Sequence, residues 1–419
     1  MRGFLPLLIT LLIQAISALA LMAVPVLVPV DPGPPRLTTA GIGFYVLFAY
    51  VGAMVGSLSA GLMVDRWGAI RTSQGALLLS AAGLALAVLL PGQLLPAALL
   101  VGLGYGPITP ASSHVLIRTT PPERRNLVFS IKQTGVPVGV ALSGFCIPSL
   151  VVVGGWGGSL ALLALVCIAT AAAAQPIQRD LDQATASGRP EAGAAVWSVR
   201  RLLSDLAEPL MVIFRHPGLR MLAAISFVLS GIQIAFTSYL VRYLTSELAM
   251  TALLAGSLLG LSQAGGVIGR IGWGWLSDRL LHPLVVLAIV CGLLGLASLA
   301  TGALALTHFS PPGLLLGALM FVFGATASGW NGVYLAEVAR QAPPGAAGKA
   351  TSGTLACTFL GVILGAPLFG LIASSAGGFA AAFGMHSVLA LGMAAILLAL
   401  SARQRAAAAR PPSPGQRPD

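Results

Sequence analysis

Charged residues are scarce in this 419-residue chain: Asp, Glu, Lys and Arg make up 8% of it, against 57% hydrophobic residues. Soluble domains carry roughly 25% charged residues, so the composition excludes a protein whose surface mostly faces water. The formal charge of +11 would suit a nucleic-acid partner, but the basic residues fall in the gaps between apolar runs. The sequence therefore predicts no nucleic-acid partner and an integral protein in contact with the lipid bilayer.

Signatures of metal, redox or nucleotide chemistry are also missing. The four cysteines (Cys146, Cys167, Cys291 and Cys357) lie inside apolar runs without metal-ligand spacing, which predicts buried thiols. Five scattered histidines form no His-rich motif, and no nucleotide-binding loop of Gly-Lys-Ser/Thr type occurs. We expect no catalytic residue, no metal and no cofactor, so an integral-membrane enzyme or an ATP-driven pump is disfavoured.

Apolar runs of spanning length recur twelve times, in two sets of six. Continuous apolar runs favour helices, because a barrel strand would alternate polar and apolar residues over about ten positions. The first run resembles a signal peptide at its start, but it continues to Val30 and is long enough to span. The expected spans are residues 4–28, 41–63, 72–91, 94–117, 127–150, 155–174, 219–241, 251–276, 283–305, 312–336, 350–374 and 378–401.

This pattern predicts an all-α membrane protein with twelve transmembrane helices in two pseudo-symmetric six-helix bundles, over residues 1–175 and 218–402. Between them lies a polar central loop, 176–217, in which 184–194 indicates a flexible linker and 197–214 an amphipathic surface helix. Residues 403–419, rich in Pro, Arg and Ala, predict a disordered tail. We expect the chain to act as a monomer.

The distribution of Lys and Arg over the loops predicts the orientation. One side collects almost all of them, including Arg66, Arg118, Arg279 and the central-loop arginines, whereas the opposite side holds only Arg36 and Arg242. Positively charged loops stay in the cytoplasm. We therefore expect both termini and the central loop to be cytoplasmic, in a bacterial inner membrane.

The two halves repeat each other. Gly-Leu-Met-Val-Asp-Arg at 61–66 follows the second run, and Gly-Trp-Leu-Ser-Asp-Arg at 274–279 follows the eighth, with Asp65 and Asp278 separated by 213 positions. Arg118-Thr-Thr-Pro-Pro and Arg340-Gln-Ala-Pro-Pro follow the fourth and tenth runs at an offset of 222. Short basic loops can look alike in any membrane protein, but an ordered pair of matches favours a duplication, which is common in secondary carriers.

These loops resemble the signature of the major facilitator superfamily, a family of secondary transporters. Gly61, Asp65, Arg66, Gly68 and Arg71 fit its motif between helices two and three; Ala69-Ile70 departs from the usual basic cluster. The second copy keeps Gly274, Asp278 and Arg279 without the later glycine. Weaker likenesses lie at Gly269–Asp278, similar to monocarboxylate and oxalate/formate carriers, and at Trp330–Tyr334 and Lys132–Gly135, similar to bacterial organic-anion carriers.

The resemblance implies a cytoplasmic gate. By this resemblance, Asp65 would lie against the positive end of a helix of the other half, or would pair with Arg66 or Arg118. Such contacts would form only while the cytoplasmic side is closed. The alternative is that these are ordinary charges at a membrane face. The gating residues implied are Asp65, Arg66, Arg71 and Arg118 in the first half, and Asp278, Arg279, Glu337 and Arg340 in the second.

The resemblance also implies a substrate path lined by helices one, four, seven and ten. Polar groups inside a span are costly and tend to face a cavity. The candidate substrate-binding residues are Gln14, Tyr105, Lys132, Gln233, Gln263, Trp330 and Asn331. Each amide could bind substrate or simply link two helices.

Three ionisable residues inside the runs have two interpretations each. Lys132, about five residues into span five, could attract an anionic substrate or extend to the interface. Arg270 has the same choice, with pairing to Glu337 as the structural alternative. His114 could carry protons, although a packed helix-end histidine is the more frequent case.

We expect a secondary carrier that moves a small organic anion by alternating access, with proton coupling as a hypothesis because no span holds an Asp or Glu at mid-depth. An exporter of drugs or metabolites is the alternative, weakened because span four lacks the arginine of drug/proton antiporters and span five lacks their Gly-Pro-rich signature. A non-transporting membrane receptor is a further alternative, without a soluble signalling domain to support it.

Overall fold

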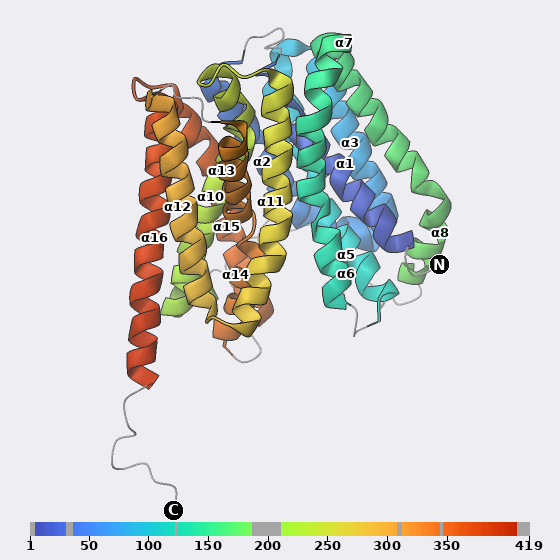
Figure 1. The fold of residues 1–419 in the computed structure, drawn as a ribbon. Coiled ribbons are helices and arrows are strands. Elements are labelled where there is room, and N and C mark those ends of the chain that lie inside the picture. The colour runs from blue at the N-terminus through green and yellow to red at the C-terminus, as the bar shows by residue number, and fades with distance from the viewer. Residues whose placement is uncertain are drawn as a thin grey trace, which may run out of the picture.

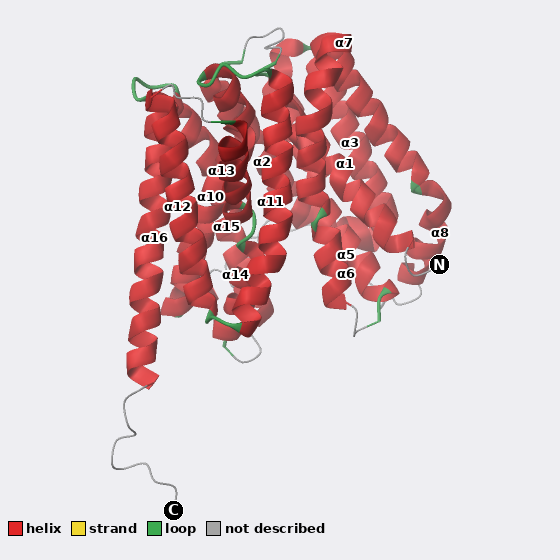
Figure 2. Cartoon of the chain, in the orientation of Figure 1, coloured by secondary structure: helices red, strands yellow, loops and turns green. Residues whose placement is uncertain are grey.

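The structure, a computed structural model, describes residues 5–30, 37–121, 125–186, 211–307, 312–343 and 347–408. Within these ranges the chain forms helices and short connections and contains no strand (Figure 2). Most of the central loop, including nearly all of the predicted surface helix at 197–214, and the tail beyond 408 lie outside the described residues. The helical architecture confirms the predicted fold class.

The first half of the chain supplies most of the helices on the right of Figure 1, although α2 lies among the second-half helices in this view. They are α1 (Leu5–Leu27), α2 (Thr39–Trp67), α3 (Ala69–Leu89), the short 3₁₀ helix η1 (Pro91–Gln93), α4 (Leu94–Tyr105), α5 (Ile108–Thr119), α6 (Arg125–Gln133), α7 (Gly135–Ala173) and α8 (Gln175–Ala186).

The second half supplies most of the helices on the left. They are α10 (Pro217–Ser246), α11 (Ala252–Arg279), α12 (Pro283–Thr307), α13 (Gly313–Ala327), α14 (Asn331–Gln341), α15 (Ala347–Ala373) and α16 (Gly378–Ala408).

Eleven helical segments among the described residues are long and apolar enough to cross a membrane. One of them, residues 131–173, is 43 residues long, which at 1.5 Å per residue is about twice the roughly 30 Å of hydrocarbon. Gly155 interrupts it with φ 58° and ψ −164°, a conformation outside the helical region. The segment therefore holds spans five and six, and the chain has the twelve predicted spans.

Equivalent helices pair in the two halves, with one difference at α3. Span one packs mainly against span five, through α1 with α7, and span two against span four, through α2 with α4. Span three packs against both spans four and six, through α3 with α4 and α7. In the second half α10 packs against α15, α11 against α13, and α12 against α16, which are the equivalent pairs of spans. A duplicated sequence thus gives a duplicated pattern of packing.

Glycines bring the paired helices together at equivalent positions. A Cβ on Gly102 of α4 would lie 1.7 Å from the Ala49 carbonyl oxygen of α2. A Cβ on Gly324 of α13 would lie 1.8 Å from the Ser262 carbonyl oxygen of α11. Gly102 and Gly324 are 222 positions apart, and Ala49 and Ser262 are 213 apart, the same offsets as in the loop motifs. Backbones can approach this closely only where side chains are absent.

The halves also meet through glycine, on the membrane face where α2 begins. A Cβ on Gly43 of α2 would lie 2.6 Å from both the Tyr239 hydroxyl of α10 and the Pro367 Cα of α15, and one on Gly256 of α11 would lie 2.0 Å from the Gly144 carbonyl of α7. The opposite membrane face, where α2 and α11 end in the repeated loops, is called the signature face below. There α6 and α14 lie apart in Figure 1.

Two boundaries differ from the sequence expectation. Residues 175–186 form α8, although most of them belonged to the predicted central loop and 184–186 to its flexible linker. Helix α16 continues to Ala408, past the predicted start of the tail at residue 403. In both places the helix continues through polar residues beyond its apolar part. A change from apolar to polar composition therefore does not mark the end of the helix.

Candidate functional site

The central feature of the site is a set of broken helices. Span four breaks between α4 and α5, span five between α6 and α7, and span ten between α13 and α14. A break leaves carbonyl oxygens without their intrahelical donors, and lipid supplies none. Such backbone is tolerated only where protein groups or a cavity satisfy it.

Arg270 of α11 donates to two of these broken segments. Its Nε donates to the Ser328 carbonyl at 2.9 Å, at the break in span ten. Its guanidinium NH1 donates to the Gln133 carbonyl at 3.1 Å, at the break in span five of the other half. The predicted alternative, pairing of Arg270 with Glu337, is wrong, since Arg270 binds backbone oxygens at the C-terminal ends of helices, where the helix dipole is negative.

Lys132 lies one residue from the Gln133 carbonyl that binds Arg270. Its side chain is 1% exposed, and its ammonium has no hydrogen-bonding partner among the described residues. The side chain therefore does not extend to the interface, which was the alternative interpretation. A buried cation without a partner is costly, so this position requires an explanation.

The predicted amides are held by neighbouring helices. Gln14 of α1 is fully buried, and its Oε1 accepts from the Thr109 hydroxyl of α5 at 3.1 Å. Its Nε2 has no partner within the described ranges. Gln233 of α10 accepts from the Trp330 indole at 3.2 Å. Both amides thus link helices, and Gln14 keeps a free donor as well.

The remaining candidates differ in their access to the centre. Tyr105, at the end of α4, lies within electrostatic range of Arg270 in the other half, so it faces the space between the halves. Asn331 donates to the Ser328 carbonyl at 3.4 Å, beside Arg270. Gln263 is 3% exposed and donates weakly, at 3.4 Å, to the hydroxyl of its neighbour Ser262. Sequence reasoning left Arg270 outside the candidate set because the helix break that orients it could not be seen.

At the signature face, the first half brings together groups from four elements. His114 of α5 lies within electrostatic range of Asp65, Arg118 and Asp182. Asp182 of α8 was not predicted to take part. Its carboxylate accepts from the backbone N–H groups of Ile70 at 2.9 Å and Arg71 at 3.2 Å, at the start of α3.

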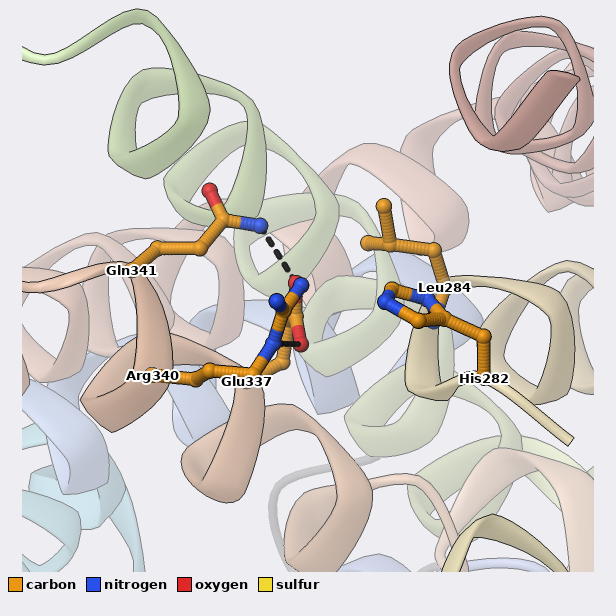
Figure 3. Close-up of polar contacts among 5 residues, drawn as sticks. All are labelled: His282, Leu284, Glu337, Arg340 and Gln341. Carbon is orange, nitrogen blue, oxygen red and sulfur yellow. Dashed lines mark hydrogen bonds and ion pairs between the residues drawn. The ribbon is translucent and has the colours of Figure 1, made fainter. Parts of the chain in front are cut away.

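In the second half, Glu337 of α14 is fully buried and is bound by its own helix (Figure 3). The Arg340 guanidinium donates to both of its oxygens, at 2.7 and 2.6 Å, and the Gln341 amide donates to one of them. Nearby, His282 accepts from the Leu284 N–H at 3.3 Å and so caps α12. Asp278 and Arg279 are exposed at the end of α11.

The sequence and fold comparisons agree with this architecture. Residues 7–353 match the family described as Major Facilitator Superfamily. This match covers well over half of the chain, so the chain belongs to that superfamily.

The curated relatives carry anions. The chain is 28% identical to the gallate transporter of Pseudomonas putida over 296 residues, 64% of each chain. It is 25% identical to the 4-hydroxybenzoate transporter PcaK of Pseudomonas putida, over 78% of this chain and 76% of that one. It is also 29% identical to the probable nitrate/nitrite transporter NarK2 of Mycobacterium tuberculosis, over 57% of this chain and 55% of that one. The match spans just under two thirds of the gallate transporter and just over half of NarK2.

Solved structures share the fold over nearly the whole chain. A crystal structure of the peptide transporter POT has a TM-score of 0.73 at 19% identity and covers 96% of this chain and 94% of its own. The D-xylose-proton symporter has a TM-score of 0.66 at 16% identity and covers 94% and 96%. At this identity the likeness establishes the fold alone.

Glu337 gives a stability prediction. Arg340→Gln removes both charged donors from a fully buried carboxylate, so it should lower the unfolding free energy by about 1–3 kcal/mol. Glu337→Gln added to Arg340→Gln removes the unpaired charge and should recover part of that loss. The measurement is the thermal midpoint of the purified protein in detergent, with exposed Arg279→Gln as control. Equal midpoints for the single and double variants would contradict this account.

Proposed function

We propose that this transporter moves a small organic anion bearing a carboxylate, by alternating access between its two halves. The observation that carries the proposal is the position of two cations in the spanning region. Arg270 comes from the second half and binds the residue next to Lys132 of the first half. An anion at this point would contact both halves.

The sequence around these cations offers no internal counter-ion. Residues 127–173 and 252–277, which contain Lys132 and Arg270, include no Asp or Glu. Two charges about 4 Å apart interact by about 4 kcal/mol at an effective dielectric of about 20. A neutral hydrogen bond contributes only about 1 kcal/mol. The site should therefore prefer a carboxylate to its amide by roughly a hundredfold.

The proposed binding set combines these cations with the polar groups on the facing helices. Gln14, Tyr105, Gln233, Trp330 and Asn331 would contact the rest of the substrate, and Gln263 would support the set from α11. The named substrates of the relatives, gallate and 4-hydroxybenzoate, support an organic anion. The nitrate/nitrite relative supports a smaller anion as a second candidate.

The signature-face charges are proposed as the gate. Asp65, Arg66, Arg71 and Arg118 lie at the ends of α2, α3 and α5, and Asp278, Arg279, Glu337 and Arg340 at the ends of α11 and α14. In this state the halves contact each other at the other face. Closing the signature face would bring the two sets together, and their interactions would shift the balance between the two open states.

Anion binding is tested by a thermal-shift screen with 4-hydroxybenzoate, gallate, acetate, nitrate and 4-hydroxybenzamide. We expect the aromatic carboxylates to raise the melting temperature and the amide to fail at the same concentration. Lys132→Ala and Arg270→Gln should abolish the shift, whereas exposed Arg220→Gln should keep it. A shift from nitrate alone would replace the organic-anion proposal, and a shift that survives Lys132→Ala would remove that residue from the site.

Proton coupling is the second part of the proposal, since the superfamily fold is shared with a proton symporter. In proteoliposomes, uptake of labelled 4-hydroxybenzoate should rise several-fold when the outside is made acidic relative to the lumen. A valinomycin-clamped membrane potential separates the pH gradient from charge movement. Uptake that ignores the gradient would leave a uniporter or exchanger, and substrate-driven efflux alone would favour the exporter.

We further propose that the signature face is cytoplasmic, in a bacterial inner membrane, because nearly all loop arginines lie on that side. A cysteine at exposed Asp180 of α8 should react with an impermeant maleimide only after the cells are permeabilised. A cysteine at exposed Ser246, the last residue of α10 at the other face, should react in intact cells. The reverse pattern would invert the orientation. Both cysteine variants are made in a protein from which the four native cysteines have been removed.

A further inference from the structure

The start of α3 is capped by a residue more than a hundred positions away. Helices α2 and α3 are joined by Gly68 alone, which is the capping position of α3 and has no side chain to fill it. The free N–H groups at a helix start usually bind a side chain at this position. Here the Asp182 carboxylate of α8 takes that role, binding the N–H groups of Ile70 and Arg71 with one oxygen each.

The cap is built into the protein and is not an accidental contact. Asp182 is 9% exposed, and Gln178, one turn earlier in α8, donates to its Oδ2 at 2.9 Å. Gln74 of α3 adds a second link, because it donates to the Ala171 carbonyl of α7 and to the Gln175 side chain of α8, both at 2.9 Å. The negative charge of Asp182 is also favourable at the positive N-terminal end of α3.

The contact with Asp182 explains why residue 68 is a glycine. Its φ of +93° is unfavourable for a residue with a side chain. A Cβ placed there would lie 2.3 Å from the Asp182 Cγ. The glycine of the signature loop therefore has a local explanation: it makes the tight turn and also leaves room for the carboxylate.

We propose that Asp182 is a positioning residue for the gate: it holds the loop 65–71 in register and ties α8, which leads into the connection between the halves, to the first half throughout the cycle. The loop carries Asp65, Arg66 and Arg71, and Asp182 binds the backbone of Arg71 directly. His114 lies within electrostatic range of both Asp65 and Asp182. Loss of the cap would release the loop and weaken closure of the signature face. The proposal rests on the gating function proposed above.

The cap itself is tested by hydrogen–deuterium exchange of the full-length protein in detergent. Asp182→Asn should increase exchange in peptides covering residues 68–74, and Gln178→Ala should do so more weakly. Asp180→Asn, an exposed carboxylate on the same helix, should leave exchange unchanged. Unchanged protection in Asp182→Asn, or the same increase in Asp180→Asn, would overturn the proposal.

The effect on gating is tested with spin labels at Thr119 of α5 and Leu280 after α11, both at the signature face, in a background without native cysteines. Asp182→Asn should shift the distance distribution toward the longer separation and lower the transport rate several-fold while KM stays unchanged. Gly68→Ala should produce a larger shift when Asp182 is present than in the Asp182→Gly background, since the Asp182 Cβ, Cγ and Oδ1 that the new methyl would meet are then absent. Equal effects in both backgrounds, or unchanged distances, would refute the positioning role. Neither structural readout needs a substrate, so both remain decisive if the anion proposal fails.

Discussion

Hydrocarbon offers no hydrogen-bond partner to a peptide group, and the centre of this transporter is organised around that constraint. Three spans are broken where the halves face each other, and each break frees carbonyl oxygens in a place that lipid cannot satisfy. Arg270 resolves two of these breaks at once, one in each half. The same arrangement that satisfies the backbone therefore fixes a guanidinium at depth, bound to the residue next to Lys132. The Lys132 ammonium has no hydrogen-bonding partner in the part of the chain that the structure describes. The residue that satisfies the backbone is thus one of those proposed to attract the anion.

The glycine contacts explain how such a polar centre can sit inside two moving bodies. Within each half, Gly102 and Gly324 lock equivalent helices at backbone distance, so that each half can move as a unit. Between the halves, Gly43 and Gly256 make similarly close contacts, but from a few positions on five helices. Contacts confined to a few glycine positions leave few side chains to be displaced when the halves separate. The contrast between the two kinds of interface is what alternating access requires.

The sequence was sufficient for the fold because the lipid imposes a simple rule: long apolar runs become helices, and the Asp65 and Asp278 loops reveal the duplication. It was insufficient wherever a polar residue acts on a distant part of the chain. Arg270 could not be told from an ordinary helix-end cation, because its acceptors arise from breaks at Gln133 and Ser328 that apolar patterning does not mark. Asp182 was assigned to a loop because the run ends before it, although α8 continues and folds back on α3. Roles that depend on a tertiary contact of a single side chain leave no periodic signal.

The two offsets of the repeat, 213 and 222, have a meaning of their own. Nine additional residues entered the second copy between its second and fourth spans, and four of them lengthen α12 relative to α3. The corner before that helix diverged with it: a one-residue turn closed by a distant carboxylate in one copy, and a longer turn closed locally by His282 in the other. The duplication thus preserved the surfaces on which helices pack and left this corner free to evolve, so that the two ancestral copies now carry different chemistry at equivalent places.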